Sequence, residues 1–151
     1  MDKIKFLDII NSTPLVSIDL IIEDQNERYL LGQRANKPAQ GFWFVPGGRI
    51  RKNETLQLAF ERIVTTELGA SCIESLNFDD AKLLGAYDHI YSDNFANEAD
   101  VNTHYVALGY KLSVTEAIHF DKDNQHSELS WWSKSELMAS ELVHQNTKNY
   151  F

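Results

Sequence analysis

The sequence has 151 residues, of which 43% are hydrophobic, and a formal net charge of −8 at pH 7. This length and apolar content are enough for one domain with a buried core, over residues 1–151, and too small for two domains of ordinary size. The acidic balance argues against a sequence-independent nucleic-acid binder, because such a protein needs a surface that neutralises phosphates.

The N-terminal segment does not have the pattern expected of a signal peptide. Its first residues mix charged side chains with short apolar runs and lack the continuous apolar core and cleavage site of a signal peptide. No stretch of the sequence is long and apolar enough to span a bilayer. Cys72 is the only cysteine, so no disulfide can form within the chain, as is usual in a reducing compartment. We therefore expect a cytoplasmic protein that does not bind membranes.

The residue pattern in the first half of the sequence predicts short strands. Leu15–Glu23 is rich in β-branched and aliphatic residues, residues 24–27 have turn chemistry, and residues 28–32 continue as a second strand, which together predict a hairpin. Residues 35–41 read as a loop. Residues 42–45 predict a short buried strand before a turn at Pro46-Gly47-Gly48, where glycine permits positive φ and close approach to a ligand.

The second half begins with a helix over residues 53–68, which Asn53 or Thr55 can cap and Gly69 can end. Long strands over residues 83–91 and 101–114 flank a polar loop at 92–100. A short strand at 130–132 and helices at 133–140 and 143–150 complete the chain. The predicted fold class is α/β, a mixed sheet sandwiched between helices.

Charge and periodicity single out candidate binding residues. Between Arg28 and Glu54 there is no acidic residue, while five cations fall there, so a small polyanion can bind locally. Arg34 and Arg49 are the candidates for diphosphate contacts, since a guanidinium binds phosphate oxygens in bidentate fashion. Glu67 falls on the apolar stripe of the predicted helix, within about 20° of Phe60, where an ionised carboxylate needs a partner such as a metal ion.

The spacing G-x5-E-x7-R-x4-E-x-G, formed by Gly48, Glu54, Arg62, Glu67 and Gly69, resembles the box of the Nudix family. The family pattern is G-x5-E-x7-R-E-U-x-E-E-x-G. Two of its glutamates are replaced here, by Ile63 and Thr66. The resemblance implies a Nudix fold and a site for a divalent metal, with the arginine of the box paired to a glutamate.

Within that family, residues 12–17, 38–49, 93–95 and 103–106 resemble the GDP-mannose mannosyl hydrolases, which have the same shortened box. This resemblance implies hydrolysis of GDP-mannose to GDP and mannose by attack of water at the anomeric carbon, with inversion. It implies one Mg²⁺ per subunit and a homodimer in which the N-terminal segment acts across the interface.

The same resemblance assigns roles to individual residues. Gly47, Glu67 and Gln125 would hold the metal, and Arg34 and Tyr105 would act on the diphosphate in catalysis. Asp19 would contact the sugar and Phe6 the guanine. The base would be His126; a histidine is suited to that role near neutral pH, but the chain has five, so residue type alone selects none of them.

Two other functions remain open. A Nudix pyrophosphohydrolase cleaving at phosphorus would release a nucleoside monophosphate, but that chemistry uses carboxylates at the positions of Ile63 and Thr66. A nucleotide-sugar binding module without turnover would need neither a base nor a metal-activated leaving group. The sequence does not choose between mannose and glucose, and it leaves the 92–100 loop as either a lid or a turn.

Overall fold

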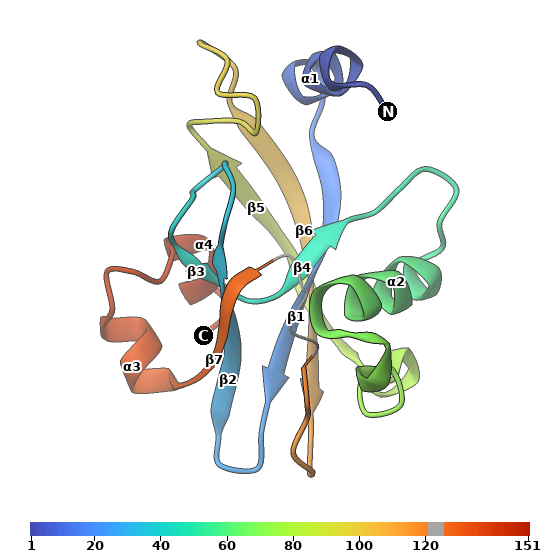
Figure 1. Cartoon of the computed structure of the whole chain (residues 1–151), viewed down its shortest axis with the longest axis vertical. Coiled ribbons are helices and arrows are strands. Elements are labelled where there is room, and N and C mark those ends of the chain that lie inside the picture. The colour runs from blue at the N-terminus through green and yellow to red at the C-terminus, as the bar shows by residue number, and fades with distance from the viewer. Residues whose placement is uncertain (121–125) are drawn as a thin grey trace.

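A computed structural model describes residues 1–120 and 126–151 of the chain, with the side chains of His126 and Ser127 excluded. In the described part, seven strands form one mixed sheet with helices on both sides. Figure 1 shows α2 on one side of the sheet and α3 and α4 on the other. The predicted fold class, a mixed sheet between helices, is confirmed.

The helices are α1 (Lys3–Ser12), α2 (Leu56–Leu68), α3 (Lys134–Ala139) and α4 (Gln145–Lys148), with short 3-10 turns at Ala70–Cys72 and Phe78–Asp80. The strands are β1 (Leu15–Glu23), β2 (Arg28–Arg34), β3 (Trp43–Phe44), β4 (Gly47–Arg49), β5 (Lys82–Tyr91), β6 (Thr103–Ser113) and β7 (His126–Ser133). No helix among the described residues is long and apolar enough to cross a membrane.

Strand β1 lies at the centre of the sheet. One edge pairs in parallel with β6 along its whole length, from Leu15 opposite Tyr105 to Glu23 opposite Ser113. The other edge is shared by β4, near Asp19, and by β2, at Glu23. Strand β6 continues antiparallel to β5, and β2 carries β3 and β7. The shared edge brings the predicted Gly-Gly segment against the middle of β1.

Two apolar clusters cover the two faces of the sheet. On one face, α2 packs Phe60, Ile63 and Val64 against the aliphatic side chains of β1, as its helical spacing predicts. On the other face, Leu31 and Trp43 pack with Leu137 of α3. Alternate side chains of a strand point to opposite faces, so β1 supplies both clusters.

The structure places several element bounds differently from the sequence prediction. Thr55, whose hydroxyl accepts from the Leu58 N–H at 3.2 Å, is the cap of α2, so the helix begins at Leu56. Helix α1 is not predicted by the apolar pattern and is capped by Asp2, which accepts from the Lys5 N–H at 2.9 Å. Strand β7 begins at His126 and not at residue 130, because it pairs with β2 over its whole length.

Candidate active site

Two adjoining pockets open beside β4. Pocket A is lined by Ser17, Asp19, Arg34, Pro38, Phe44, Val45, Gly47, Gly48, Arg49, His89, Tyr91 and Tyr105. Pocket B is lined by Arg34, Ala35, Asn36, Gly47, Gly48, Glu67 and Tyr105. Because Arg34, Gly47, Gly48 and Tyr105 line both, the pockets form two parts of one site.

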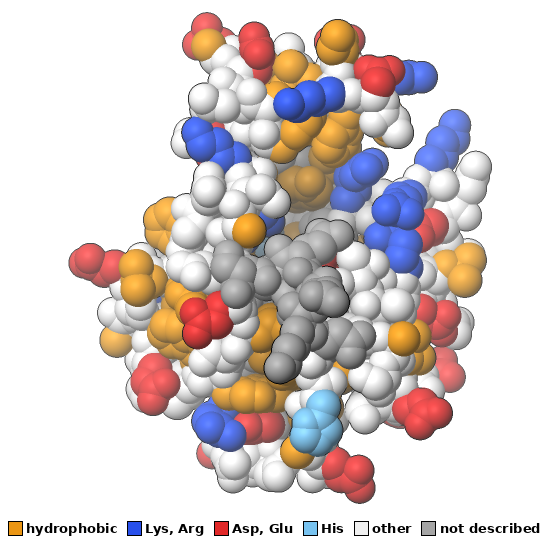
Figure 2. Space-filling model, in the orientation of Figure 1, with side chains coloured by type: hydrophobic (Ala, Val, Ile, Leu, Met, Phe, Trp, Pro, Cys, Tyr) orange, Lys and Arg blue, Asp and Glu red, His pale blue; other side chains and the backbone are white. Residues whose placement is uncertain are grey.

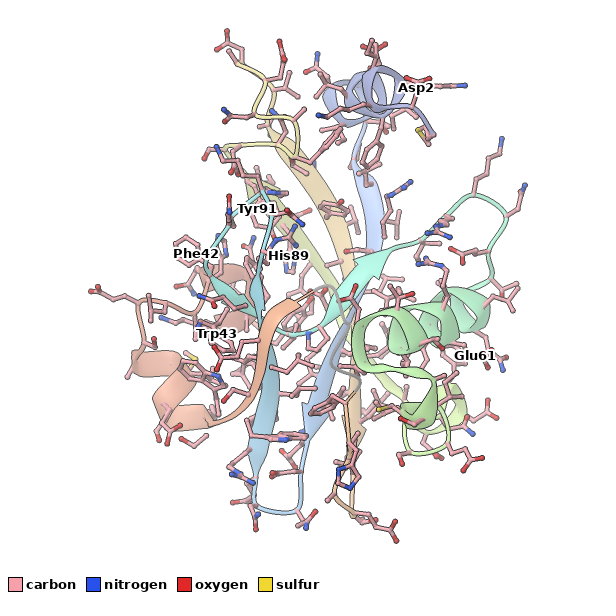
Figure 3. The ribbon with its side chains drawn as sticks, viewed as in Figure 1. Asp2, Phe42, Trp43, Glu61, His89 and Tyr91 are labelled. Carbon is pink, nitrogen blue, oxygen red and sulfur yellow. The ribbon has the colours of Figure 1, made fainter. Side chains whose placement is uncertain are left out.

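The sheet register gathers side chains that are far apart in the sequence. Asp19 lies opposite Gly47 across the β1–β4 pair. Tyr105 of β6 lies between Leu15 of β1 and His89 of β5. His89 and Tyr91 are two residues apart on one strand, so they point to the same face of the sheet (Figure 3). The predicted residues Asp19, Arg34, Arg49, Gly47, Glu67 and Tyr105 all line this site.

The Gly47-Gly48 segment is a strand rather than the turn that its composition predicts, and neither glycine has positive φ. Glycine is needed here for space. A Cβ on Gly47 would lie 2.5 Å from the Ile18 carbonyl oxygen and closer still to Asp19 Oδ1. A Cβ on Gly48 would lie 3.1 Å from Ile63 Cγ1 of α2. The bare backbone lets β4 fit between β1 and the box helix.

Asp19 is the acidic residue of pocket A. Its Oδ2 accepts a hydrogen bond from the Tyr150 hydroxyl at 2.7 Å and lies 3.6 Å from His89 Nδ1. Burial raises the pKa of the Asp19 carboxyl to about 7, although the Tyr150 hydrogen bond and the charge of Arg34 act in the opposite direction. Near neutral pH this carboxyl therefore exists in both protonation states, and either state can hydrogen-bond a ligand hydroxyl.

His89 is 4% exposed and lies beside Asp19. Burial lowers its pKa to about 4; the neighbouring His144 lowers it further and Asp88 opposes both. The ring is thus neutral at physiological pH, and its contact with Asp19 is not an ion pair. Its Nε2 is buried and has no hydrogen-bond partner within the described part of the chain, so it is available to a polar ligand in pocket A.

Arg34 and Arg49 also line pocket A, and each guanidinium group lies by an aromatic ring. The Arg34 guanidinium lies 5.7 Å from the centre of the Phe44 ring, and that of Arg49 lies 4.5 Å over the Phe6 ring. Phe6 in turn packs on Phe95 of the 92–100 loop, at 5.1 Å between ring centres. Helix α1 therefore brings Phe6 to Arg49, next to pocket A. Figure 2 shows Lys and Arg side chains grouped around a hollow beneath α1.

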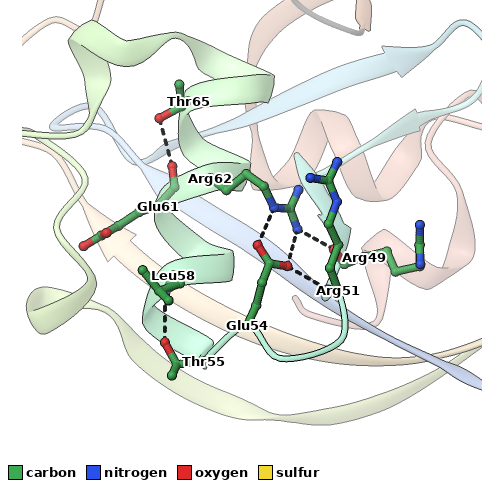
Figure 4. Close-up of polar contacts among 8 residues, drawn as sticks. All are labelled: Arg49, Arg51, Glu54, Thr55, Leu58, Glu61, Arg62 and Thr65. Atoms are coloured by element: carbon green, nitrogen blue, oxygen red, sulfur yellow. Dashed lines mark hydrogen bonds and ion pairs between the residues drawn. The ribbon is translucent and has the colours of Figure 1, made fainter. Parts of the chain in front are cut away.

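Two residues of the box, Glu54 and Arg62, hold the segment that leads from β4 into α2 (Figure 4). Arg62 donates to both carboxylate oxygens of Glu54, at 2.6 and 2.9 Å, and to the Arg49 carbonyl at 2.7 Å. Glu54 also accepts from the Arg51 N–H at 2.7 Å. The Arg62 hydrogen bonds hold the pKa of Glu54 well below its usual range, at about 2. This pairing of the box arginine with a glutamate is the one that the resemblance implies.

The residues at the two replaced glutamate positions have different surroundings. Ile63 is 1% exposed and belongs to the core under β4, whereas Thr66 is exposed to solvent. Glu67, by contrast, is 7% exposed and lines pocket B, as its place on the apolar stripe predicts. Among the side chains that the structure describes, no group of three or more His, Cys, Asp or Glu is arranged to hold a metal ion.

The oxygen donors of pocket B nevertheless fit a single Mg²⁺. Glu67 supplies a carboxylate, and Gly47 lines the same pocket with its backbone. Mg²⁺ is commonly held by one or two carboxylates, with waters and substrate phosphates completing its shell. The third predicted ligand, Gln125, lies outside the described residues. For His126 only the backbone is described; it lies opposite Arg34 in the β2–β7 register.

The polar residues that sequence reasoning did not assign to the site include Ser17, His89, Tyr91 and Tyr150. His89 carried no signal that separated it from the other four histidines. Ser17 lies two residues before Asp19 on β1, but its residue type gave no signal that separates it from other strand serines. Tyr91 lies far from Asp19 and Arg49 in the sequence, and that distance hides their common location. Tyr150 lies 131 residues from its partner Asp19, so only the folded chain joins them.

Comparison with known proteins gives consistent matches. The chain matches the NUDIX domain family over residues 13–151. It is 39% identical over 122 residues to the low-salt glycan biosynthesis protein Agl8 of Haloferax volcanii, covering 80% of this chain and 72% of that protein.

Solved structures share the fold. The MutT NUDIX hydrolase from Burkholderia pseudomallei superposes with a TM-score of 0.68 at 25% identity, covering 91% of this chain and 95% of the other. The NUDIX domain of Shewanella oneidensis NrtR, solved as a complex with ADP ribose, has a TM-score of 0.64 at 18% identity, covering 97% and 92%. The second likeness concerns the fold alone.

Proposed function

This chain belongs to the NUDIX domain family, and from that premise we propose that it hydrolyses GDP-mannose to GDP and mannose. In the proposed reaction, water attacks the anomeric carbon from the face opposite GDP, with inversion. The bond between that carbon and the diphosphate oxygen breaks, GDP departs with the electron pair, and the proton of the water passes to a base on the protein.

The division of the site into two unlike pockets carries this proposal. Pocket B joins Arg34 to the Glu67 carboxylate, which is the chemistry expected around a metal-bound diphosphate. Pocket A continues from Arg34 to Asp19 and His89, which present hydrogen-bonding groups from a largely buried wall. A hydroxyl-rich group attached to the diphosphate would meet polar partners in pocket A.

The remaining substrate contacts follow from the same geometry. Arg34 and Tyr105 line both pockets, so they are placed to bind the diphosphate between its two ends. Burial raises the pKa of Tyr105, so its hydroxyl stays protonated and can donate to a phosphate oxygen. Phe6, whose ring packs with the Arg49 guanidinium next to pocket A, is the proposed contact for guanine.

The depleted box favours attack at carbon over attack at phosphorus. Cleavage at phosphorus in this family uses several carboxylates on the box helix to gather metal ions around a phosphate. Here Ile63 and Thr66 stand at two of those carboxylate positions, and Ile63 is a core residue against Gly48. Glu67, the retained glutamate of the box helix, lines pocket B. A bound Mg²⁺, held by the Gly47 carbonyl, Glu67 and Gln125, would supply Lewis-acid neutralisation of the charge on the departing diphosphate.

His126 is the proposed base. In the β2–β7 register, the backbone of His126 lies opposite Arg34, the β2 residue that lines both pockets. A neutral imidazole there would take the proton of the attacking water. The name of the Haloferax volcanii relative, which refers to glycan biosynthesis, supports a sugar-containing substrate.

Product identification in ¹⁸O-labelled water tests the proposal. The protein is incubated with GDP-mannose and Mg²⁺, the products are separated, and their masses are measured by mass spectrometry. We expect GDP and mannose with the label on the sugar. GMP and mannose 1-phosphate would instead assign the pyrophosphohydrolase reaction, and tight binding with no products would assign a binding module. GDP-glucose in parallel decides the sugar preference.

A further inference from the structure

Tyr150 reaches Asp19 from the other end of the chain. Its hydroxyl donates to Asp19 Oδ2 at 2.7 Å, across 131 residues. Tyr150 follows α4, so the C-terminal segment lies against the centre of β1, where pocket A is formed. This is the sole hydrogen bond to Asp19 from a described side chain, apart from the longer approach of His89 Nδ1 at 3.6 Å.

The packing around Tyr150 fixes where its hydroxyl points. The ring lies on Gly109 of β6, where a Cβ would come within 2.5 Å of Tyr150 Cε1. Tyr87 packs edge-on at 4.6 Å between ring centres, and His89 lies at 5.7 Å. A ring confined on these sides cannot swing away without moving β5 or β6. Burial and the Asp19 carboxylate raise the pKa of Tyr150, so the hydroxyl keeps its proton and remains a donor.

The two oxygens of Asp19 therefore have different surroundings. Oδ2 is taken by Tyr150, while Oδ1 lies against Gly47 of β4, which lines both pockets. No hydrogen bond from a described residue reaches Oδ1. We propose that Tyr150 is a positioning residue: it holds one oxygen of Asp19 so that the other is presented to a hydroxyl of the sugar in pocket A. This proposal rests on the proposed function, because it assigns the sugar-binding group.

The removal of one hydroxyl tests it. Tyr150→Phe keeps the ring that packs on Gly109 and removes only the donor, and Tyr87→Phe is the matched control, since Tyr87 touches the same ring without reaching Asp19. We expect Tyr150→Phe to weaken GDP-mannose binding by about tenfold, because Asp19 is no longer held in the orientation that hydrogen-bonds the sugar and the loss of one such bond has an effect of this order, while GDP binding stays unchanged. Tyr87→Phe should change neither affinity.

A double-mutant cycle separates positioning from a general structural role. If Tyr150 acts through Asp19, the Tyr150→Phe change costs no further affinity for GDP-mannose in an Asp19→Ala background. Additive losses, or an equal loss of GDP binding, would overturn the proposal. Calorimetric binding of GDP-mannose, GDP and mannose to all four proteins gives these values without any need for turnover.

A crystal structure of Tyr150→Phe distinguishes failure of this inference from failure of the proposed function. An Asp19 side chain that turns away from Gly47 supports the positioning role, even if GDP-mannose proves not to be the substrate. An Asp19 side chain unchanged in place and in its contacts would refute it, whatever the products of the wild-type enzyme.

Discussion

At the scale of single residues, the buried carboxyl of Asp19 gives the protein a pH-dependent stability. Its pKa is about 7 in the folded chain and about 4 in an unfolded chain. Between these values the native state binds the proton more tightly, so the contribution of Asp19 to stability falls as the pH rises through this window. Above pH 7 the Asp19 carboxyl is ionised in the folded chain, and the burial of this charge lowers the stability of the fold by its full amount.

The change Asp19→Asn removes that charge and leaves an oxygen that can accept from Tyr150. We expect the variant to melt at a temperature about 2–4 °C or more above the wild type at pH 8, and at the same temperature at pH 4, in metal-free buffer. Thermal unfolding at both pH values measures this. A variant that is less stable at pH 8 would show that the carboxylate is better compensated than its burial indicates.

His126 is expected to set the rate of the chemical step. His126→Gln should lower turnover by orders of magnitude with little change in substrate affinity, because a general base acts in the transition state. His104→Gln, on a half-exposed histidine outside both pockets, is the control. The turnover of the wild type should increase with pH around a pKa of about 6–7. Because the pKa of Asp19 is about 7, the same increase in turnover with pH must also be found in Asp19→Asn if His126 is its source.

Glu67 is expected to carry the response to metal. Glu67→Gln should weaken both turnover and the dependence of turnover on Mg²⁺ concentration, because an amide oxygen binds a hard cation less strongly than a carboxylate. Glu61→Gln, on the same helix but outside both pockets, is the matched control. A Mg²⁺ titration of activity measures the effect, and a wild-type response in Glu67→Gln would show that the metal binds elsewhere.

At the scale of elements, the position of β4 depends on the absence of side chains. Gly47→Ala would drive a methyl group into Asp19 and the Ile18 carbonyl, both on β1, and a rigid strand cannot yield as a side chain can. We expect a loss of stability of about 1–3 kcal/mol and a fall in turnover of more than about tenfold, since β4 also lines both pockets.

Gly48→Ala provides the comparison for that prediction. Its methyl group would meet Ile63 at 3.1 Å, where the contact is with a side chain that can shift. Denaturant unfolding should therefore give a smaller loss for Gly48→Ala than for Gly47→Ala. The reverse order would mean that packing of α2, and not the β1–β4 contact, limits this strand.

At the scale of the whole molecule, helix α1 leaves much of its surface uncovered. Ile10 is its buried residue, while Ile4 is 78% exposed, and Figure 1 shows the helix set apart from the body of the fold. The homodimer that the family resemblance implies remains a prediction. A partner subunit lying against α1 would cover Ile4.

Sedimentation of an Ile4→Asp variant tests the homodimer. We expect the wild type to have the mass of a dimer and Ile4→Asp to shift toward the monomer, because a charge buried in an interface without a partner is costly. Met138→Asp, at an exposed apolar residue of α3, should leave the mass unchanged. A monomeric wild type would contradict the homodimer and leave Phe6 to act beside Arg49 of its own chain.

The sequence by itself determined the fold class, most strands, the box helix and the burial of Glu67. These features depend on the period of apolar residues and on caps such as Thr55, which are local properties of the chain. It also placed Asp19, Arg34 and Tyr105 in one candidate site through resemblance, and Arg49 through the chemistry of its guanidinium; all four line pocket A. It missed α1, and it took β4 for a turn because its glycines indicated backbone freedom.

Only the tertiary structure decided why those glycines are needed, which histidine lies beside Asp19, and which residue holds Asp19 in place. Strand β4 forms because β1 offers it a free edge, and pairing with another strand is a long-range contact that composition does not encode. Burial, likewise, is a property of the assembled molecule. It makes His89 neutral and raises the pKa of Asp19, and it brings Tyr150 to a carboxylate that lies 131 residues away in the sequence.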